Sequence, residues 1–203
     1  MKTMPSEPMT ARGRASRERI VARVADVVAE HGVRAVSLEQ VLAAAGASKS
    51  QLYHYFGGRD QLMEAAVAYR CEQVVASLTQ AFAAVATMAD LERVLAGFVT
   101  AYEQDPSGCP IGTLASDVAG HHEGARERVV DAFAAWERLF SDAFERMRAA
   151  GELRADAAPG QLATAVLAGL EGGMLLSETR RDGTSLRIAV DAALTFARTF
   201  ATV

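Results

Sequence analysis

Residues 36–62 read VSLEQVLAAAGASKSQLYHYFGGRDQL, and this stretch decides the fold of the first third of the chain. Ser37 precedes an apolar run and has Gln40 three residues later, which is the signature of a capping box at a helix start. Gly46 is expected to end that helix, and Ser48 to cap a second, shorter one. Two helices joined by so tight a turn predict a helix-turn-helix, whose second helix can enter the major groove of DNA.

The second helix of this pair carries polar side chains suited to DNA. Lys49 and His54 can reach guanine edges or phosphate, and the amide of Gln51 can read a base edge. Three arginines ahead of the first helix are expected to form a mobile basic arm that contacts phosphate. These arginines are Arg12, Arg14 and Arg17, and the helix itself is expected over residues 16–31.

Composition bounds the class of protein. The chain has 203 residues, of which 50% are hydrophobic and 23% charged, so it can bury a substantial core. Charged residues interrupt every alanine-rich run, which excludes a membrane span, and the first residues lack the apolar segment of a secretion signal. Two cysteines, Cys71 and Cys109, do not make a disulfide framework. We expect a cytoplasmic bacterial protein with no membrane partner.

Charge and helix patterning divide the chain into two parts. Residues 1–60 carry nine Lys/Arg and six Asp/Glu, a net charge of +3, while the remainder carries twelve and nineteen, a net of −7. A basic head on an acidic body favours a polyanion-binding domain at the N-terminus. Strong helix formers dominate throughout and predict an all-α fold of about nine helices. Beyond residue 60 the expected helices are 60–85, 91–103, 111–119, 124–150, 159–181 and 185–201.

One stretch resembles the DNA-binding domain of TetR-type repressors. Its most specific part is GASKSQLYHYF at residues 46–56, followed by RDQL at 59–62, and the resemblance covers about residues 15–62. The resemblance implies that Ser37 and Ser48 cap their helices, that Tyr53 contacts the DNA backbone and that Arg59 binds phosphate. Together with the basic arm, the predicted DNA-binding residues are Arg14, Arg17, Ser37, Ser48, Lys49, Ser50, Gln51, Tyr53, His54 and Arg59.

The C-terminal part resembles one TetR subgroup. The run SGCPIGTLA at residues 107–115 is similar to the start of the sixth helix in the subgroup that includes LmrA and YxaF, and LEGG at 170–173 suits the same subgroup. The resemblance implies a DNA-binding domain over residues 1–60 and a ligand-binding and dimerisation domain over 61–203.

Aromatic residues at helical spacing predict a small-molecule site in the second domain. For most of them a plain core face is the simpler interpretation, yet an apolar cavity with a few polar handles is the usual form of such a site. Trp136 and Tyr102 are the preferred contacts because each has an apolar body and a polar tip. The full set of predicted ligand-binding residues is Phe98, Tyr102, Leu114, Trp136, Phe140, Leu170 and Met174.

The last two expected helices predict a homodimer. The helix over 159–181 is apolar nearly all round, which indicates burial on two sides, and its neighbour repeats the pattern. Packing both pairs across a two-fold axis gives a four-helix interface. The predicted interface residues are Leu162, Val166, Gly173, Leu186, Val190, Ala193 and Ala197.

The expected function is therefore a ligand-responsive repressor that binds a palindromic operator as a homodimer and is released by an apolar or aromatic effector. Cys109 at a helix start leaves a redox sensor open, and Asp117 with His121, His122 and Glu123 leaves a metal-responsive regulator open. An enzyme working from the acidic body is the alternative of a different class, but no nucleophile motif or dinucleotide fingerprint appears. We expect no cofactor, no metal and no catalytic residue.

Overall fold

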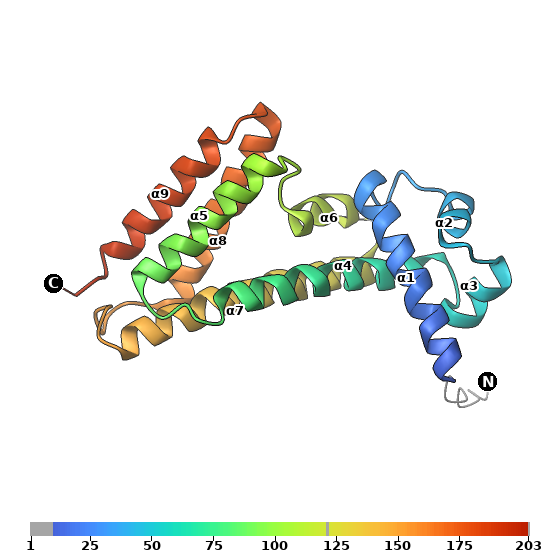
Figure 1. Cartoon of the computed structure of the whole chain (residues 1–203), viewed down its shortest axis with the longest axis horizontal. Helices are drawn as coiled ribbons and strands as arrows, with labels where there is room; N and C mark the ends of the chain where they lie inside the picture. The colour runs from blue at the N-terminus through green and yellow to red at the C-terminus, as the bar shows by residue number, and fades with distance from the viewer. Residues whose placement is uncertain (1–9, 121, 203) are drawn as a thin grey trace. The chain divides into compact units, whose positions relative to one another are not determined.

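The computed structural model describes residues 10–120 and 122–202, which form nine α-helices and confirm the predicted all-α class (Figure 1). Outside the helices, these residues contain one isolated antiparallel bridge, between Leu153 and Ala201. The helices are α1 (Ala11–His31), α2 (Leu38–Ala45), α3 (Lys49–Phe56), α4 (Arg59–Phe82), α5 (Met88–Gln104), α6 (Pro110–Val118), α7 (Glu123–Ala149), α8 (Pro159–Arg180) and α9 (Thr184–Arg198).

The chain divides into two compact units. The first unit runs up to Arg70 and also takes in Asp117–Arg128. The second unit consists of Cys71–Ser116 and the chain from Val129 onward. Three helices, α4, α6 and α7, therefore contribute residues to both units. The first unit reaches further along α4 than the domain proposed over residues 1–60, and it includes a segment from the middle of the chain.

The start of α1 corrects one expectation. Thr10 is the N-cap, its hydroxyl accepting the backbone N–H of Gly13 at 3.1 Å, and α1 begins at Ala11. The arginines predicted to form a mobile arm therefore lie in the first turns of a capped helix. The Thr10 cap and the strong helix formers arginine and alanine explain the error, since together they outweigh Gly13 and extend the helix to Ala11.

Helices α2 and α3 begin at their predicted caps. The capping box of Ser37 and Gln40 is confirmed, and Gly46 ends α2 in the left-handed conformation. Ser48 caps α3, and its side chain accepts the backbone N–H of Gln51. Apolar side chains from α1, α2, α3 and the start of α4 are buried in this unit. They include Ile20, Val24, Val41, Leu42, Leu52, Phe56 and Leu62.

In the second unit, α8 and α9 pack side by side (Figure 1). Gly173 marks the closest approach, since a Cβ there would lie 2.7 Å from Cβ of Ala189 and 3.1 Å from Cα of Leu186. The buried Ser177 hydroxyl accepts the backbone N–H of Leu186 at 2.9 Å, which satisfies one of the free donors at the start of α9. The pair is thus held by a small residue and a buried hydrogen bond between the helices.

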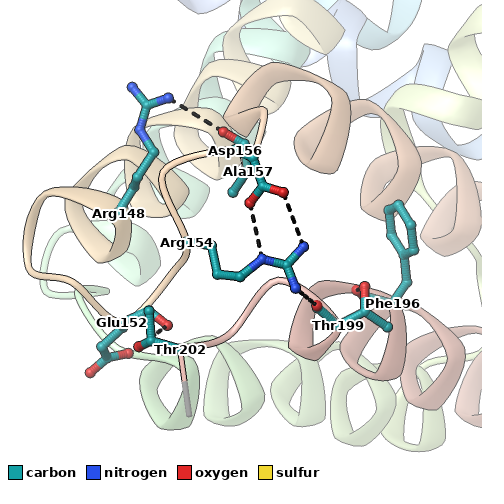
Figure 2. Close-up of polar contacts among 8 residues, drawn as sticks. All are labelled: Arg148, Glu152, Arg154, Asp156, Ala157, Phe196, Thr199 and Thr202. Atoms are coloured by element: carbon teal, nitrogen blue, oxygen red, sulfur yellow. Dashed lines mark hydrogen bonds and ion pairs between the residues drawn. The ribbon is translucent and has the colours of Figure 1, made fainter.

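A cluster of polar contacts ties the end of α9 to the loop before α8 (Figure 2). The Arg154 guanidinium donates to the Asp156 carboxylate, with Nε 3.0 Å from Oδ1, and to the backbone carbonyl of Thr199 at 2.9 Å. Thr202 donates its backbone N–H to the carbonyl of Glu152 at 2.9 Å. These contacts anchor the described end of the chain within the second unit.

No helix within residues 10–120 and 122–202 is both long enough and apolar enough to cross a lipid bilayer.

Candidate DNA-binding surface and effector site

Helix α3 separates its side chains into a buried face and an exposed face. Leu52 and Phe56 are buried in the first unit. Ser48, Lys49, Ser50, Tyr53 and His54 are exposed, and the Tyr53 side chain is 63% exposed. Five of the predicted DNA-binding residues therefore share one exposed polar surface. Such a surface on the second helix of a helix-turn-helix is the part that reads base edges in the major groove.

Gln51, which is predicted to read a base edge, also caps its own helix. Its side-chain oxygen accepts the backbone N–H of Ser48 at 2.9 Å, so Ser48 and Gln51 form a second capping box. The same Ser-x-x-Gln pattern predicted the first capping box and could have predicted this one. This bond uses one of the two lone pairs of the amide oxygen, so the reading of a base edge by Gln51 stays a prediction.

Arg59, which is predicted to bind phosphate, contacts the turn between α1 and α2. Its Nη2 donates to the backbone carbonyls of Val33 and Val36, at 3.3 and 3.1 Å. Its Nη1 lies 3.9 Å from Oδ1 of Asp60. The Nη2 group thus braces the turn between α1 and α2, while Nη1 faces the exposed carboxylate of Asp60.

Two other predicted basic contacts remain accessible on the first unit. Arg14 is exposed, while Arg17 is half-buried with its guanidinium 5.1 Å from the centre of the Phe56 ring.

Lys49 Nζ lies 3.6 Å from Oε1 of Glu39, and both side chains are well exposed. An exposed ion pair of this kind contributes little to stability, so a phosphate could displace Glu39.

In the second unit, the predicted ligand contacts include an aromatic cluster. Trp136 lies between Phe98 and Phe140, with ring centroids 5.6 and 6.4 Å apart. The indole nitrogen of Trp136 and the hydroxyl of Tyr102 are buried and have no hydrogen-bond partner. Burial, followed by the nearby Asp182 and Glu178 charges, raises the pKa of Tyr102. Buried polar groups are normally hydrogen-bonded, so these two need a partner.

Six of the seven predicted ligand contacts are buried. Phe98 is half-buried, which makes it the most accessible member of the set. The buried members are Tyr102, Leu114, Trp136, Phe140, Leu170 and Met174.

Glu171 is a polar group that the sequence analysis did not assign to the site. It follows Leu170 on α8, and one of its carboxyl oxygens is buried without a partner. Burial raises the pKa of this carboxyl. Gly112 leaves room for it, since a Cβ there would lie 2.6 Å from Oε2 of Glu171. A lone acid inside an apolar helix could have signalled this role, because such residues are rarely buried without a reason.

Cys109 contacts the same carboxyl, and its thiol donates a hydrogen bond to Glu171. Burial and the neighbouring Glu171 raise the pKa of this thiol far above its ordinary range. Burial also raises the pKa of Cys71, to about 11. Because the thiolate is the reactive form, burial lowers the share of reactive thiolate at both cysteines.

The metal-site alternative does not gain a ligand cluster. The Asp117 carboxylate accepts the backbone N–H of Val33, and His122 lies 3.9 Å from Asp60. His121 lies outside the residues that the structure describes. Among the described residues, no group of three or more His, Cys, Asp or Glu side chains is arranged to hold a metal ion. A pocket of about 250 Å³ beside His122 is lined by Asp60, Gln61, Glu64, His122, Glu123, Gly124 and Ala125.

The predicted dimer residues lie inside the single chain. All seven are buried, and they pack α8 and α9 against their own unit. Because α8 is apolar nearly all round, the sequence pattern could not separate its face turned inward from its face turned outward. The corrected set of exposed apolar side chains on these helices is Leu175, Leu176, Ile188 and Phe196, and the buried set is Leu162, Val166, Gly173, Leu186, Val190, Ala193 and Ala197.

Two family models match this chain. One, described as bacterial regulatory proteins, tetR family, matches residues 20–66. The other, described as transcriptional regulator LmrA/YxaF-like, C-terminal domain, matches residues 84–192, more than half of the chain. The chain belongs to the TetR family. The resemblance of residues 46–62 and of residues 107–115 to this family and subgroup is thereby confirmed.

This TetR-family regulator is similar in sequence to several other regulators. It is 32% identical over 180 residues to the HTH-type transcriptional regulator Rv0196 of Mycobacterium tuberculosis, covering 84% of this chain and 88% of that protein. It is 30% identical over 190 residues to YxaF of Bacillus subtilis, covering 90% and 95%. The solved structure of the TetR regulator CifR with operator DNA has the same fold, with a TM-score of 0.74, 24% identity and coverage of 88% and 95%.

Membership of the TetR family fixes the function at a coarse level. The protein is a DNA-binding transcriptional regulator, with its helix-turn-helix in α2 and α3.

Proposed function

We propose that this TetR-family regulator is a ligand-responsive repressor that binds a palindromic operator as a homodimer. The observation that carries the proposal is the composition of the exposed surface of α3. Lys49, Ser50, Tyr53 and His54 present donors and acceptors there, while Leu52 and Phe56 hold the helix in the core. Side chains of these types discriminate base edges and bind phosphate. The complex of CifR with 26-bp operator DNA supports the same use of the fold here.

The exposed apolar side chains of α8 and α9 support the homodimer. Leu175 and Ile188 are 62% and 63% exposed, and Leu176 and Phe196 are 47% and 43% exposed. Large exposed apolar patches on two adjoining helices are typical of interaction sites. A two-fold dimer places the same patch against itself, and it also presents two recognition helices to two half-sites.

The unpartnered polar atoms of the second unit support an aromatic effector with hydrogen-bonding groups. Trp136 Nε1 is a donor, Glu171 Oε1 is an acceptor when ionised, and the Tyr102 hydroxyl can be either. An effector that pairs with them would relieve the free-energy penalty of leaving buried polar groups without partners. It would lower operator affinity only if it binds one conformation of the dimer better than another.

Footprinting of the intergenic DNA beside the gene tests the DNA-binding proposal. The expected result is a protected inverted repeat, with half-site centres about 10 base pairs apart or a multiple of this distance. Sedimentation of the complex should give two chains per repeat. Protection without sequence preference, or a single half-site bound by one chain, would contradict the proposal. Ile188→Asp is expected to abolish the dimer, while Asp142→Ala on the exposed side of α7 serves as the control.

Fluorescence tests the effector proposal, because Trp136 is the single tryptophan of the chain. Aromatic compounds are titrated while Trp136 emission and operator release are followed together. An effector should change both signals at the same concentration. A compound that changes Trp136 emission and leaves operator affinity unchanged would separate the aromatic cluster from regulation.

A further inference from the structure

The carboxyl group of Glu171, on α8, has no matching cation. Its Oε1 is buried without a hydrogen-bond partner, and the thiol of Cys109 donates to the same carboxyl. Burial is the main cause of its raised pKa, and no cation in the described part of the chain offsets that effect. Ionising a buried carboxyl costs free energy unless a positive charge pairs with it. The second unit therefore contains an acid that lacks a counter-ion.

Two acids of α8 approach two glycines near the start of α6. A Cβ at Gly112 would lie 2.6 Å from Oε2 of Glu171, and a Cβ at Gly108 would lie 2.5 Å from Oε2 of Glu178. The two acids are seven residues apart and so lie on one face of the helix, two turns from each other. Glycine at both positions lets the carboxyl groups occupy space that a side chain would otherwise fill.

The acidic face of α8 continues toward Tyr102 on α5. Burial and then the charges of Asp182 and Glu178 raise the pKa of the Tyr102 hydroxyl, so both carboxylates lie near it. Tyr102 is buried, whereas the two acids are exposed. Arg187, at the start of α9, is paired with Glu103 and so is not free to neutralise them. Exposed acids beside buried polar groups attract cations from solution.

Aromatic rings adjoin this acidic face. Phe98 and Tyr102 are four residues apart on α5, which places them on one side of the helix. The ring of Trp136 lies 5.6 Å from that of Phe98. The faces of such rings attract cations, while the unpartnered indole N–H of Trp136 needs an acceptor. These surroundings suit a ligand with a positive charge and an acceptor atom on an aromatic frame.

We propose that the effector of this regulator is an aromatic amine that binds in its protonated form, with its ammonium group paired with Glu171. This assignment rests on the proposed function, because it names the chemical class of the effector that we place in the second unit. The ammonium group supplies the positive charge that Glu171 lacks, and an oxygen on the aromatic frame accepts the indole N–H of Trp136. A neutral aromatic compound leaves the carboxyl without a counter-ion, and an anionic one is repelled by it.

Compounds that share a ring system and differ in charge test this assignment. Phenyl, naphthyl and methoxynaphthyl compounds are compared, each as the aminomethyl, the hydroxymethyl and the carboxylate derivative. Calorimetric titration of the full chain gives the affinities, and the melting temperature is followed in parallel. The amine should bind at least about tenfold more tightly than the alcohol on the same ring, because hydrogen bonds to charged groups contribute more than neutral ones. The carboxylate should bind most weakly.

Two variants separate the charge of Glu171 from its part in packing. Glu171→Gln keeps the size of the side chain and removes the charge, and Glu171→Met is a second neutral variant if the first does not fold. Either should weaken binding of the amine by about tenfold or more and change binding of the alcohol by less than about twofold. Asp142→Asn, an equal change of charge at an exposed site on α7, is the control and should alter neither affinity.

The outcomes distinguish this assignment from the proposed function. Alcohols or carboxylates that bind as tightly as the amines would overturn the charge assignment and leave the effector site standing. Equal weakening of amine and alcohol in Glu171→Gln would also overturn it, because a purely structural role moves both affinities alike. Amines that bind and do not release the operator repeat would show that they are not effectors. Binding by no compound of any charge would instead sink the effector site of the proposed function.

Discussion

Helices α3 and α8 show how differently the sequence determines the two units. In α3 the boundaries come from Ser48 and the glycine after Phe56, and each is a local signal within a few residues. In α8 the cap, Ala158, makes no side-chain hydrogen bond, and the local signal for the start is Pro159 at the first helical position. Local chemistry therefore predicts which face of α3 is exposed. Which face of α8 is exposed depends on the neighbours that cover the helix.

The largest expected effect lies in the core of the second unit. Phe140 is fully buried and its ring meets those of Phe82 and Trp136. Phe140→Ala should lower the free energy of unfolding by about 3–5 kcal/mol, because it removes aromatic contacts and leaves a cavity. Chemical denaturation measures this change. Val130→Ala on the same helix, at a site 50% exposed, should change it by less than about 0.5 kcal/mol. Similar losses at both positions would contradict this description of the core.

The DNA-binding surface of the first unit gives the next largest effect. His54→Ala should weaken operator binding by about 1–3 kcal/mol, because His54 is exposed on α3 where base edges are read. Binding to random DNA should weaken less, and the melting temperature should stay unchanged. The matched control is His31→Ala, an exposed histidine at the end of α1. A loss of affinity that is equal for operator and random DNA would show that His54 contacts phosphate and does not read a base edge.

A smaller effect tests the local cap. Ser48→Ala should lower the free energy of unfolding by about 1 kcal/mol, because the backbone N–H of Gln51 loses its acceptor at the start of α3. Ser50 lies two residues further along the chain and is exposed. Ser50→Ala should change the free energy of unfolding by less than about 0.5 kcal/mol. Thermal melts of both variants compare them. If Ser50→Ala destabilises as much as Ser48→Ala, the cap does not hold α3 in place.

The smallest effect concerns Glu171 and depends on pH. Because burial raises the pKa of its carboxyl, the folded state is favoured below the unfolded pKa and loses stability as pH rises through the folded value. Glu171→Gln should therefore raise the melting temperature at pH 8, and this gain should shrink toward pH 4. Glu178→Gln, at an exposed position on the same helix, is the control. A gain from Glu171→Gln that stays constant with pH would show that ionisation of this carboxyl is not the cause.

The fold was predictable because its signals are local. Helix starts at Ser37 and Ser48 and the stop at Gly46 depend on residues within one turn, and the structure confirms each of them. The roles of Arg59 and Glu171 were not predictable in the same way. Arg59 looks like a surface cation in the sequence, and only tertiary structure places its donors on the carbonyls of Val33 and Val36. The partner of a long side chain depends on contacts far along the chain.

The dimer surface shows the same limit. An all-round apolar helix predicts burial on two sides, but periodicity does not say which side meets the protein's own core. Burial assigns Leu162 and Val166 to the core and leaves Leu175 and Ile188 exposed. The tertiary contact at Gly173 determines this rotation, because only the glycine allows α9 to come so close.

Salt-dependent DNA binding tests the central claim most directly. The affinity of the full chain for the inverted repeat and for random DNA of equal length is measured between 50 and 200 mM salt, a range over which several phosphate contacts change affinity by about 10³–10⁵-fold. The account predicts that both affinities fall as salt rises and that the repeat stays at least about 10³-fold tighter. Equal affinities for the two DNAs at every salt concentration would contradict a sequence-specific regulator.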